Sequence, residues 1–183
     1  MKDSRQDVVR FWFEETAPVQ WFQINPAFDN SIRERFADAY HMACAGYCNT
    51  WAQDADGALA LILLFDQFSR NMFRGTPEAY ATDARARTIA AAALETGFDQ
   101  IHPPHRRRFF YLPFEHSENI DDQYRSVSLF ATLREDDPLS YEYALRHLQT
   151  IERFGRFPHR NAILGRVNTP DEAKFLTENG KNG

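Results

Sequence analysis

The sequence predicts an all-α protein: a single domain of about eight to nine helices that pack as neighbours joined by short loops. Three observations predict it. Apolar residues recur at helical spacing along most of the chain, helix caps and C-terminal glycines recur between them, and strand-like alternation is missing. A chain of 183 residues with 16 phenylalanines can bury one core. We therefore expect one domain over residues 1–183, with its core at 4–178 and a frayed tail at 179–183.

The N-terminal part is expected to form two helices, which an aromatic, proline-containing loop separates. Asp3 or Ser4 can cap the first helix, which should reach Glu15. Asp29 or Asn30 can cap the second, a helix of about 18 residues with one apolar side. In each case a side-chain oxygen would accept a hydrogen bond from the exposed backbone N–H groups of the first turn.

The middle of the chain carries the strongest helical signal. The run from Ala58 to Phe65 is apolar on every face, so we expect a central buried helix that ends before Gly75. This run is far shorter than the ~20 residues that a membrane-spanning helix needs. Thr76 and Pro77 can start the next segment, and the alanine-rich stretch 83–95 is a strong helix former.

The C-terminal part is expected to hold further capped helices. One helix should be interrupted at Pro113, because proline lacks a backbone donor. Asp121 can cap the next helix, and a third should start after Asp137 and stop at Gly155. The sequence Thr-Pro-Asp-Glu at 169–172 fits the capping box of a last helix.

Composition excludes several classes of protein. The net charge of −5 argues against a general nucleic-acid binder. The N-terminus lacks the apolar region of a signal peptide, and two cysteines make no disulfide framework, so we expect a soluble, cytoplasmic protein with no membrane segment. His41, Cys44 and Cys48 share a helical face, but paired zinc-ligand spacing is missing, which favours core packing over a metal site. The familiar nucleotide, acyl-transfer and zinc-protease motifs are also missing, so no cofactor is implied.

Polar residues directly follow the apolar run of the central helix. Asp66, Arg70 and Arg74 are spaced at i, i+4 and i+8, which places them on one stripe. Charges at that depth need partners. They could bind a ligand, or they could form an ion-pair network that fixes the helix.

The stretch "FEHSE" places Glu115, His116 and Glu118 just past Pro113. The unperturbed pKa of histidine is close to neutral, so His116 could act as a general acid or base with a neighbouring carboxylate. The alternative is a histidine that is hydrogen-bonded for structural reasons only.

The stretch "FGRFPHRN" combines four donor-bearing residues with no carboxylate. Arg156, His159, Arg160 and Asn161 must find acceptors elsewhere, and the candidates are Asp66, Glu115, Glu118 or an anionic ligand. The interleaved phenylalanines argue against a solvated loop because they would hold this segment against the core. Ion pairing within the fold is the remaining alternative.

These stretches resemble a bacterial family, the domain of unknown function 924 family. The resemblance is carried by "LLFDQFSRNMFRGTPEAYATD", "FFYLPFEHSE" with "DDQYRSVSLF", and "FGRFPHRNAILGRVNTPDEAKFL", and it covers roughly residues 8–176. It implies a tetratricopeptide-like α-α superhelix, although the consensus tetratricopeptide repeat pattern is missing. The family brings no established activity. Some members have been labelled membrane proteins, which the short apolar run does not support.

Three hypotheses of function follow. The first is a binding module for a small anionic ligand or an acidic peptide end. Its site would be formed by Asp66, Arg70, Arg74, Glu118, Arg156, His159, Arg160 and Asn161. The second is a hydrolase-type enzyme, in which His116 or His159 acts with Glu115 or Glu118 beside the arginines. The third is a scaffold for a protein partner, with a homodimer as one form, in which every polar cluster is structural.

Overall fold

The computed structural model describes residues 5–179, and these residues contain helices, turns and loops but no strand. The all-α prediction is therefore confirmed for this part of the chain. The caps expected at Asp3 or Ser4 and the tail residues 180–183 lie outside it. The expected domain divides into two compact units. The first runs up to Arg74 and resumes over Glu78–Pro113, and the second holds Gly75–Pro77 and the chain from Phe114 onward.

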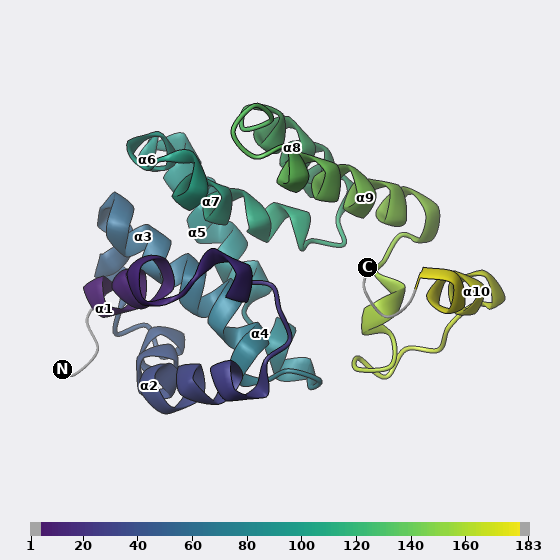
Figure 1. The fold of residues 1–183 in the computed structure, drawn as a ribbon, viewed down its shortest axis with the longest axis horizontal. Coiled ribbons are helices and arrows are strands. Elements are labelled where there is room, and N and C mark those ends of the chain that lie inside the picture. The colour runs from purple at the N-terminus through teal and green to yellow at the C-terminus, as the bar shows by residue number, and fades with distance from the viewer. Residues whose placement is uncertain (1–4, 180–183) are drawn as a thin grey trace. The chain divides into compact units, whose positions relative to one another are not determined.

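The helices follow one another along the chain (Figure 1), and the connections at 11–25 and 155–169 are long, with short π or 3-10 turns of their own. Those that begin in the first unit are α1 (Arg5–Arg10), α2 (Pro26–Cys44), α3 (Ala55–Ile62), α4 (Ser69–Met72), α5 (Asp83–Glu95), α6 (Phe98–Ile101) and α7 (Pro104–Glu115). Those of the second unit are α8 (Ile120–Ala131), α9 (Pro138–Phe154) and α10 (Pro170–Asn179). Within the second unit, α8 and α9 pack along each other as a helical hairpin (Figure 1).

Aromatic side chains form the core of the first unit. The fully buried Trp12 ring lies 5.4 Å from the Phe68 ring and 5.8 Å from the Phe109 ring, measured between centroids. The Trp21 indole N–H donates to the Trp12 carbonyl at 2.9 Å and so fixes the loop that precedes α2. Burying rings of this size contributes most of the apolar stabilisation expected of such a core.

The central helix is confirmed, with a π turn in its middle. This turn, η4 (Leu63–Phe68), lies between α3 and α4 and is buried throughout. A π turn breaks the regular hydrogen-bond ladder, and the Phe65 carbonyl accepts from two hydroxyls here. Ser69 Oγ donates at 2.8 Å and Thr82 Oγ1 at 2.7 Å. Asp66 is part of the same turn.

Two of the predicted caps were wrong. The cap of α2 is Asn25, which accepts from the backbone N–H groups of the first turn, and neither Asp29 nor Asn30 starts the helix. Asp29 is instead buried within α2, where its carboxylate accepts a hydrogen bond from Arg74. Asn119 caps α8 in place of Asp121, because its side-chain oxygen reaches the N–H of Asp121 itself at 2.8 Å.

The predicted interruption at Pro113 was also wrong, since α7 continues through it to Glu115. One proline removes one hydrogen bond, and the end of the helix is supported from outside. The amide of Gln123 donates to the Glu115 carbonyl and to the Ser117 carbonyl, both at 2.7 Å. These bonds satisfy carbonyl groups that a helix end leaves without intrahelical partners.

Other boundaries are confirmed. Helix α5 covers the predicted 83–95, and Asp137 caps α9 by accepting from the Ser140 N–H at 3.2 Å. Gly155 follows α9 with φ of +68°, a conformation that glycine adopts without strain. The capping box of α10 is present in both directions between Thr169 and Glu172.

Candidate functional site

Asp66 and Arg70 form one cluster in the first unit together with Asp83. Asp66 is fully buried, and its Oδ1 lies 3.2 Å from Nη1 of Arg70. Arg70 also donates to both oxygens of Asp83, at 2.9 and 3.0 Å. Burial disfavours the Arg70 charge, but the carboxylates of Asp66 and Asp83 outweigh this effect and raise the pKa of Arg70. The guanidinium therefore stays charged and joins the central helix to α5.

Arg74 belongs to a different cluster of the same unit. It donates to the two oxygens of Asp29 at 2.6 and 2.8 Å, and the Asn71 amide donates to Asp29 at 2.7 Å. Burial alone would raise the pKa of Asp29, but the hydrogen bonds from Arg74 and Asn71 lower it. The predicted stripe of three charges is thus divided between two ion-pair clusters, and each of its arginines binds a carboxylate with two nitrogens.

Three nitrogen-rich side chains of the second unit surround one buried aromatic ring, that of Phe157. Cζ of Arg160 lies 4.4 Å from the ring centroid. The rings of His147 and His159 lie 5.3 and 5.5 Å from it, centroid to centroid. Phe157 and Arg160 are both buried. We refer to Phe157, Arg160, His147 and His159 as the Phe157 cluster.

Glu115 reaches the Phe157 cluster through His147. Its Oε1 lies 3.3 Å from Nδ1 of His147, and the same nitrogen lies 2.9 Å from the backbone carbonyl of Tyr143. The Tyr143 carbonyl can only accept, so Nδ1 is the nitrogen that donates to it, and Nε2 is the other ring nitrogen. A carboxylate that orients an imidazole in this way is a recurring arrangement in acid–base catalysis.

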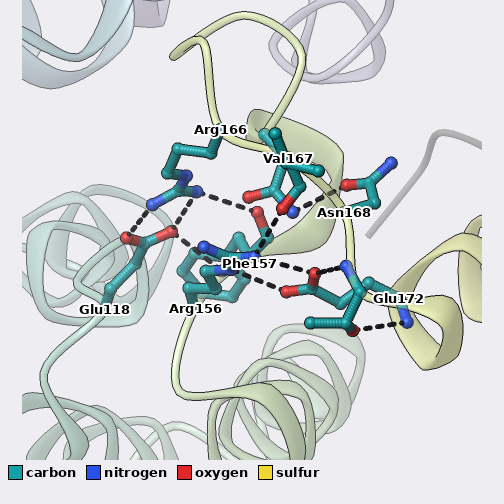
Figure 2. Close-up of polar contacts among 9 residues, drawn as sticks. Glu118, Arg156, Phe157, Arg166, Val167, Asn168 and Glu172 are labelled. Atoms are coloured by element: carbon teal, nitrogen blue, oxygen red, sulfur yellow. Dashed lines mark hydrogen bonds and ion pairs between the residues drawn. The ribbon is translucent and has the colours of Figure 1, made fainter.

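Glu118 holds the start of the segment that follows α9. It accepts the Phe157 N–H at 2.8 Å and receives both terminal nitrogens of Arg166, at 2.7 and 2.9 Å (Figure 2). Burial works to raise the pKa of Glu118, but the hydrogen bonds from Arg166 and Phe157 lower it. Glu118 is therefore ionised at neutral pH and fixes the position of the Phe157 backbone.

Arg156 binds Glu172 at the start of α10. Its Nε and Nη2 donate to the two carboxylate oxygens at 2.6 and 2.8 Å, and Nη2 also donates to the Val167 carbonyl at 2.9 Å (Figure 2). Glu172 in addition accepts the Thr169 N–H at 2.7 Å. The hydrogen bond from Arg156 is the main reason why the pKa of Glu172 falls to about 2.

The remaining predicted residues of the second unit lie close to the Phe157 cluster. Nη1 of Arg160 donates to the His116 carbonyl at 2.9 Å, which brings "FEHSE" and "FGRFPHRN" together. The fully buried Asn161 donates to Oδ1 of Asn168 at 2.7 Å. The pKa of His159 falls to about 3, first because the ring is buried and then because Arg160, His147 and His116 are nearby. His159 is therefore neutral at physiological pH.

The structure places Asp66, Arg70 and Arg74 in the first unit and the other predicted residues in the second. Asp66 was one of the acceptors considered for the "FGRFPHRN" donors, but Arg156 and Arg160 both find acceptors within their own unit.

Sequence reasoning missed several residues of these clusters. They are Asp29, Asp83, His147, Arg166 and Glu172. One signal for His147 was available: it lies three residues after Ala144 and four before Ile151, both of which belong to the buried side of α9. A titratable residue on a buried helix face needs a partner, and here the partner is Glu115.

Among residues 5–179, no group of three or more histidine, cysteine or acidic residues is arranged to hold a metal ion. None of the helices described there has the length and apolar character needed to cross a membrane.

Comparisons with known proteins identify the family but no activity. No curated protein matches the sequence. A solved structure of a protein of unknown function, ATU0120 from Agrobacterium tumefaciens, is similar with 45% sequence identity and a TM-score of 0.90, over 95% of this chain and 97% of that one. The model of the family described as bacterial protein of unknown function DUF924 matches residues 8–180. The chain therefore belongs to the DUF924 family of bacterial proteins.

Proposed function

We propose that the second unit binds a small anionic ligand at the Phe157 cluster. One observation carries this proposal: Arg160, His147 and His159 gather around a single buried ring, within 5.5 Å of its centroid. Guanidinium and imidazole N–H groups are the donors that proteins use for carboxylate and phosphate. The ring supplies an apolar surface that strengthens such contacts by excluding water.

Mutual repulsion within the cluster supports the same function. Arg160, His147 and His116 all lower the pKa of His159, and Glu118 acts in the opposite direction. An anion placed among these groups would relieve the repulsion and stabilise a protonated His159. Ligand binding would therefore be coupled to proton uptake and would become tighter as the pH falls.

The ion pairs narrow the set of residues that we propose for the site. Arg70, Arg74 and Arg156 each bind a carboxylate of the protein with two nitrogens. Breaking such a pair to bind a ligand would leave a carboxylate without its partner, which is costly in a buried position. We assign ligand contact to Arg160 and the histidines because they gather around the Phe157 ring, and we assign support to Glu118 and Asn161.

Isothermal titration of the full chain with inorganic phosphate and with citrate, at pH 6 and pH 8, tests this function. We expect saturable binding that is tighter at pH 6 and that is lost in Arg160→Gln. Arg153→Gln removes an exposed arginine near the end of α9 and serves as the matched control. If the wild-type protein binds neither anion, or if both variants bind like the wild type, the proposed site is wrong.

A second candidate function is hydrolysis by acid–base catalysis, which the contact between Glu115 and His147 favours. Nε2 of His147 would take a proton from a water molecule as the water oxygen attacks an ester carbonyl. The same proton would then pass to the leaving group. Arg160 would stabilise the negative charge that develops on the carbonyl oxygen.

Release of p-nitrophenol from p-nitrophenyl acetate and from an acidic p-nitrophenyl ester, p-nitrophenyl succinate, tests this candidate. Turnover should fall in His147→Gln and in Glu115→Gln, whereas His41→Gln, at an exposed histidine, should keep it. Turnover that does not depend on His147 would rule it out.

Three broader expectations stay part of the proposal. The family resemblance implies a tetratricopeptide-like superhelix, and the α8–α9 hairpin is the kind of helix pair that such folds stack. We also propose a cytoplasmic location without nucleic-acid or membrane partners. Finally, self-association as a homodimer stays a proposal.

A further inference from the structure

Gln123 connects α8 to the proposed site through Glu115. Its side chain is fully buried, and its Nε2 donates to the Glu115 and Ser117 carbonyls, both at 2.7 Å. His147 contacts the side chain of the same glutamate from α9, with 3.3 Å between its Nδ1 and Oε1 of Glu115. Gln123 and His147 therefore both contact Glu115, and His147 belongs to the Phe157 cluster.

The contacts of Gln123 also fix which way its amide points. Carbonyl oxygens only accept hydrogen bonds, so the amide nitrogen faces the carbonyls at 115 and 117 and Oε1 faces away from them. Within residues 5–179, no donor reaches this Oε1, although the atom is buried. A buried carbonyl oxygen without a donor is unusual, because it has given up its hydrogen bonds to water and received none in return.

Ser126 presents a second polar group of this kind on the same side of α8. It follows Gln123 by one helical turn and is also fully buried. The part of the chain that the structure describes offers no hydrogen-bond partner for its Oγ either. Two buried polar groups thus remain unsatisfied on the side of α8 that contacts Glu115.

The Phe157 cluster and these two groups call for different ligand chemistry. Arg160 and the histidines offer N–H donors, whereas Oε1 of Gln123 can only accept. An ionised phosphate ester or carboxylate satisfies the N–H donors but has no hydrogen to donate to Oε1. A hydroxyl can donate to Gln123 and at the same time accept from the Ser126 hydroxyl.

We infer that the ligand of the Phe157 cluster is an anion that also carries hydroxyl groups, as sugar phosphates and sugar acids do. Its charged group binds Arg160 and the histidines, and a hydroxyl binds Gln123 and Ser126. The inference rests on the proposed function, because it names the class of ligand for that same site. Such a site discriminates against an analogue without the hydroxyl, which leaves the buried polar groups unpaired.

Isothermal titration of the full chain at pH 7 with two matched pairs of ligands tests this inference. n-Propyl phosphate and glycerol 3-phosphate share a carbon chain and a phosphate group and differ in hydroxyl groups. Propionate and glycerate make the same comparison for carboxylates. We expect the hydroxylated member of at least one pair to bind about tenfold more tightly, as the added hydrogen bonds predict. The pair that shows the preference identifies the charged group as phosphate or carboxylate.

Two variants assign the preference to α8. Ser126→Ala and Gln123→Met should each reduce the preference for the hydroxylated ligand, and Ser126→Ala should bind the ligand without hydroxyls like the wild type. A change that only disturbs the fold would weaken both members of a pair alike. Ser128→Ala, at an exposed serine of the same helix that donates to the Tyr124 carbonyl, is the matched control and should keep the preference. Ser126→Ala alone decides the test if Gln123→Met does not fold.

Equal affinity within both pairs would overturn the inference and leave the anion site intact. A preference that both α8 variants retain in full would overturn it as well, because the hydroxyls would then bind elsewhere. If phosphate, citrate and all of these ligands fail to bind, the proposed function itself is wrong, so the two failures are distinguishable.

Discussion

Glu172 receives both nitrogen donors of Arg156, at 2.6 and 2.8 Å, while it completes the capping box of α10 by accepting the Thr169 N–H at 2.7 Å. One carboxylate, with 1% of the residue exposed, therefore performs two tasks. It neutralises the arginine that follows α9 and starts the next helix.

Glu172→Gln should destabilise the protein by about 1–3 kcal/mol, since the amide can neither balance the Arg156 charge nor accept at both oxygens. Urea unfolding followed by circular dichroism measures the change. Glu178→Gln is the control, because this exposed residue of α10 makes only a 3.9 Å contact with Lys174. Equal stability of the two variants would show that the Arg156 pair contributes nothing.

The low pKa of His159 predicts a specific dependence of stability on pH. The ordinary value is 6.5 and the folded value is about 3, so between these pH values the unfolded chain binds the proton and the folded chain does not. Folding is thus favoured above pH 6.5 and loses stability as the pH falls towards 3. His159→Asn should flatten this part of the profile, whereas His41→Asn should not. Urea titrations at pH 4, 5, 6 and 7 measure the slope, and an unchanged slope in His159→Asn would contradict the prediction.

Gly57 is predicted to tolerate no side chain. A Cβ atom at this position of α3 would lie 2.0 Å from the Trp51 backbone oxygen. Gly57→Ala must therefore displace backbone, at a cost of about 3 kcal/mol or more. Gly97→Ala is the comparison: Gly97 has φ of +73° with open space around it, so its cost is conformational and about 1 kcal/mol. Thermal unfolding ranks the two variants, and a smaller effect at Gly57 would refute the close contact.

Helix ends that are set by residues within one turn could be predicted from the sequence. Helix α9 starts after Asp137 and ends at Gly155 as expected, because cap and stop act over one turn. Where two or more acidic or amide residues near a helix start could act as its cap, the local sequence does not decide which of them does. Asp29 is an adequate cap in isolation, but Arg74, 45 residues away, binds its carboxylate inside the helix.

The candidate site could be predicted only in part for the same reason. Composition identified Arg156, Arg160 and His159 as donors that need acceptors. The acceptors themselves depend on tertiary packing, as the contact of Arg160 with the His116 carbonyl, 44 residues earlier, shows. His147 was missed although it lies on the buried side of α9, because its partner Glu115 approaches it only in the folded chain.

The ion pair at the start of α10 also determines how this part of the protein would open. Helix α10 buries little apolar surface: Glu172 is its buried residue, and Phe175 and Leu176 are only half-buried. Glu172 and the Phe175 ring, which lies 5.1 Å from the Phe154 ring between centroids, attach this helix. Protonation of Glu172, with its pKa of about 2, would remove the first of these attachments and lower the protection of α10 against amide exchange. In strong acid, α10 would therefore detach as a separate cooperative unit, with early amide exchange, before the aromatic core of the first unit unfolds.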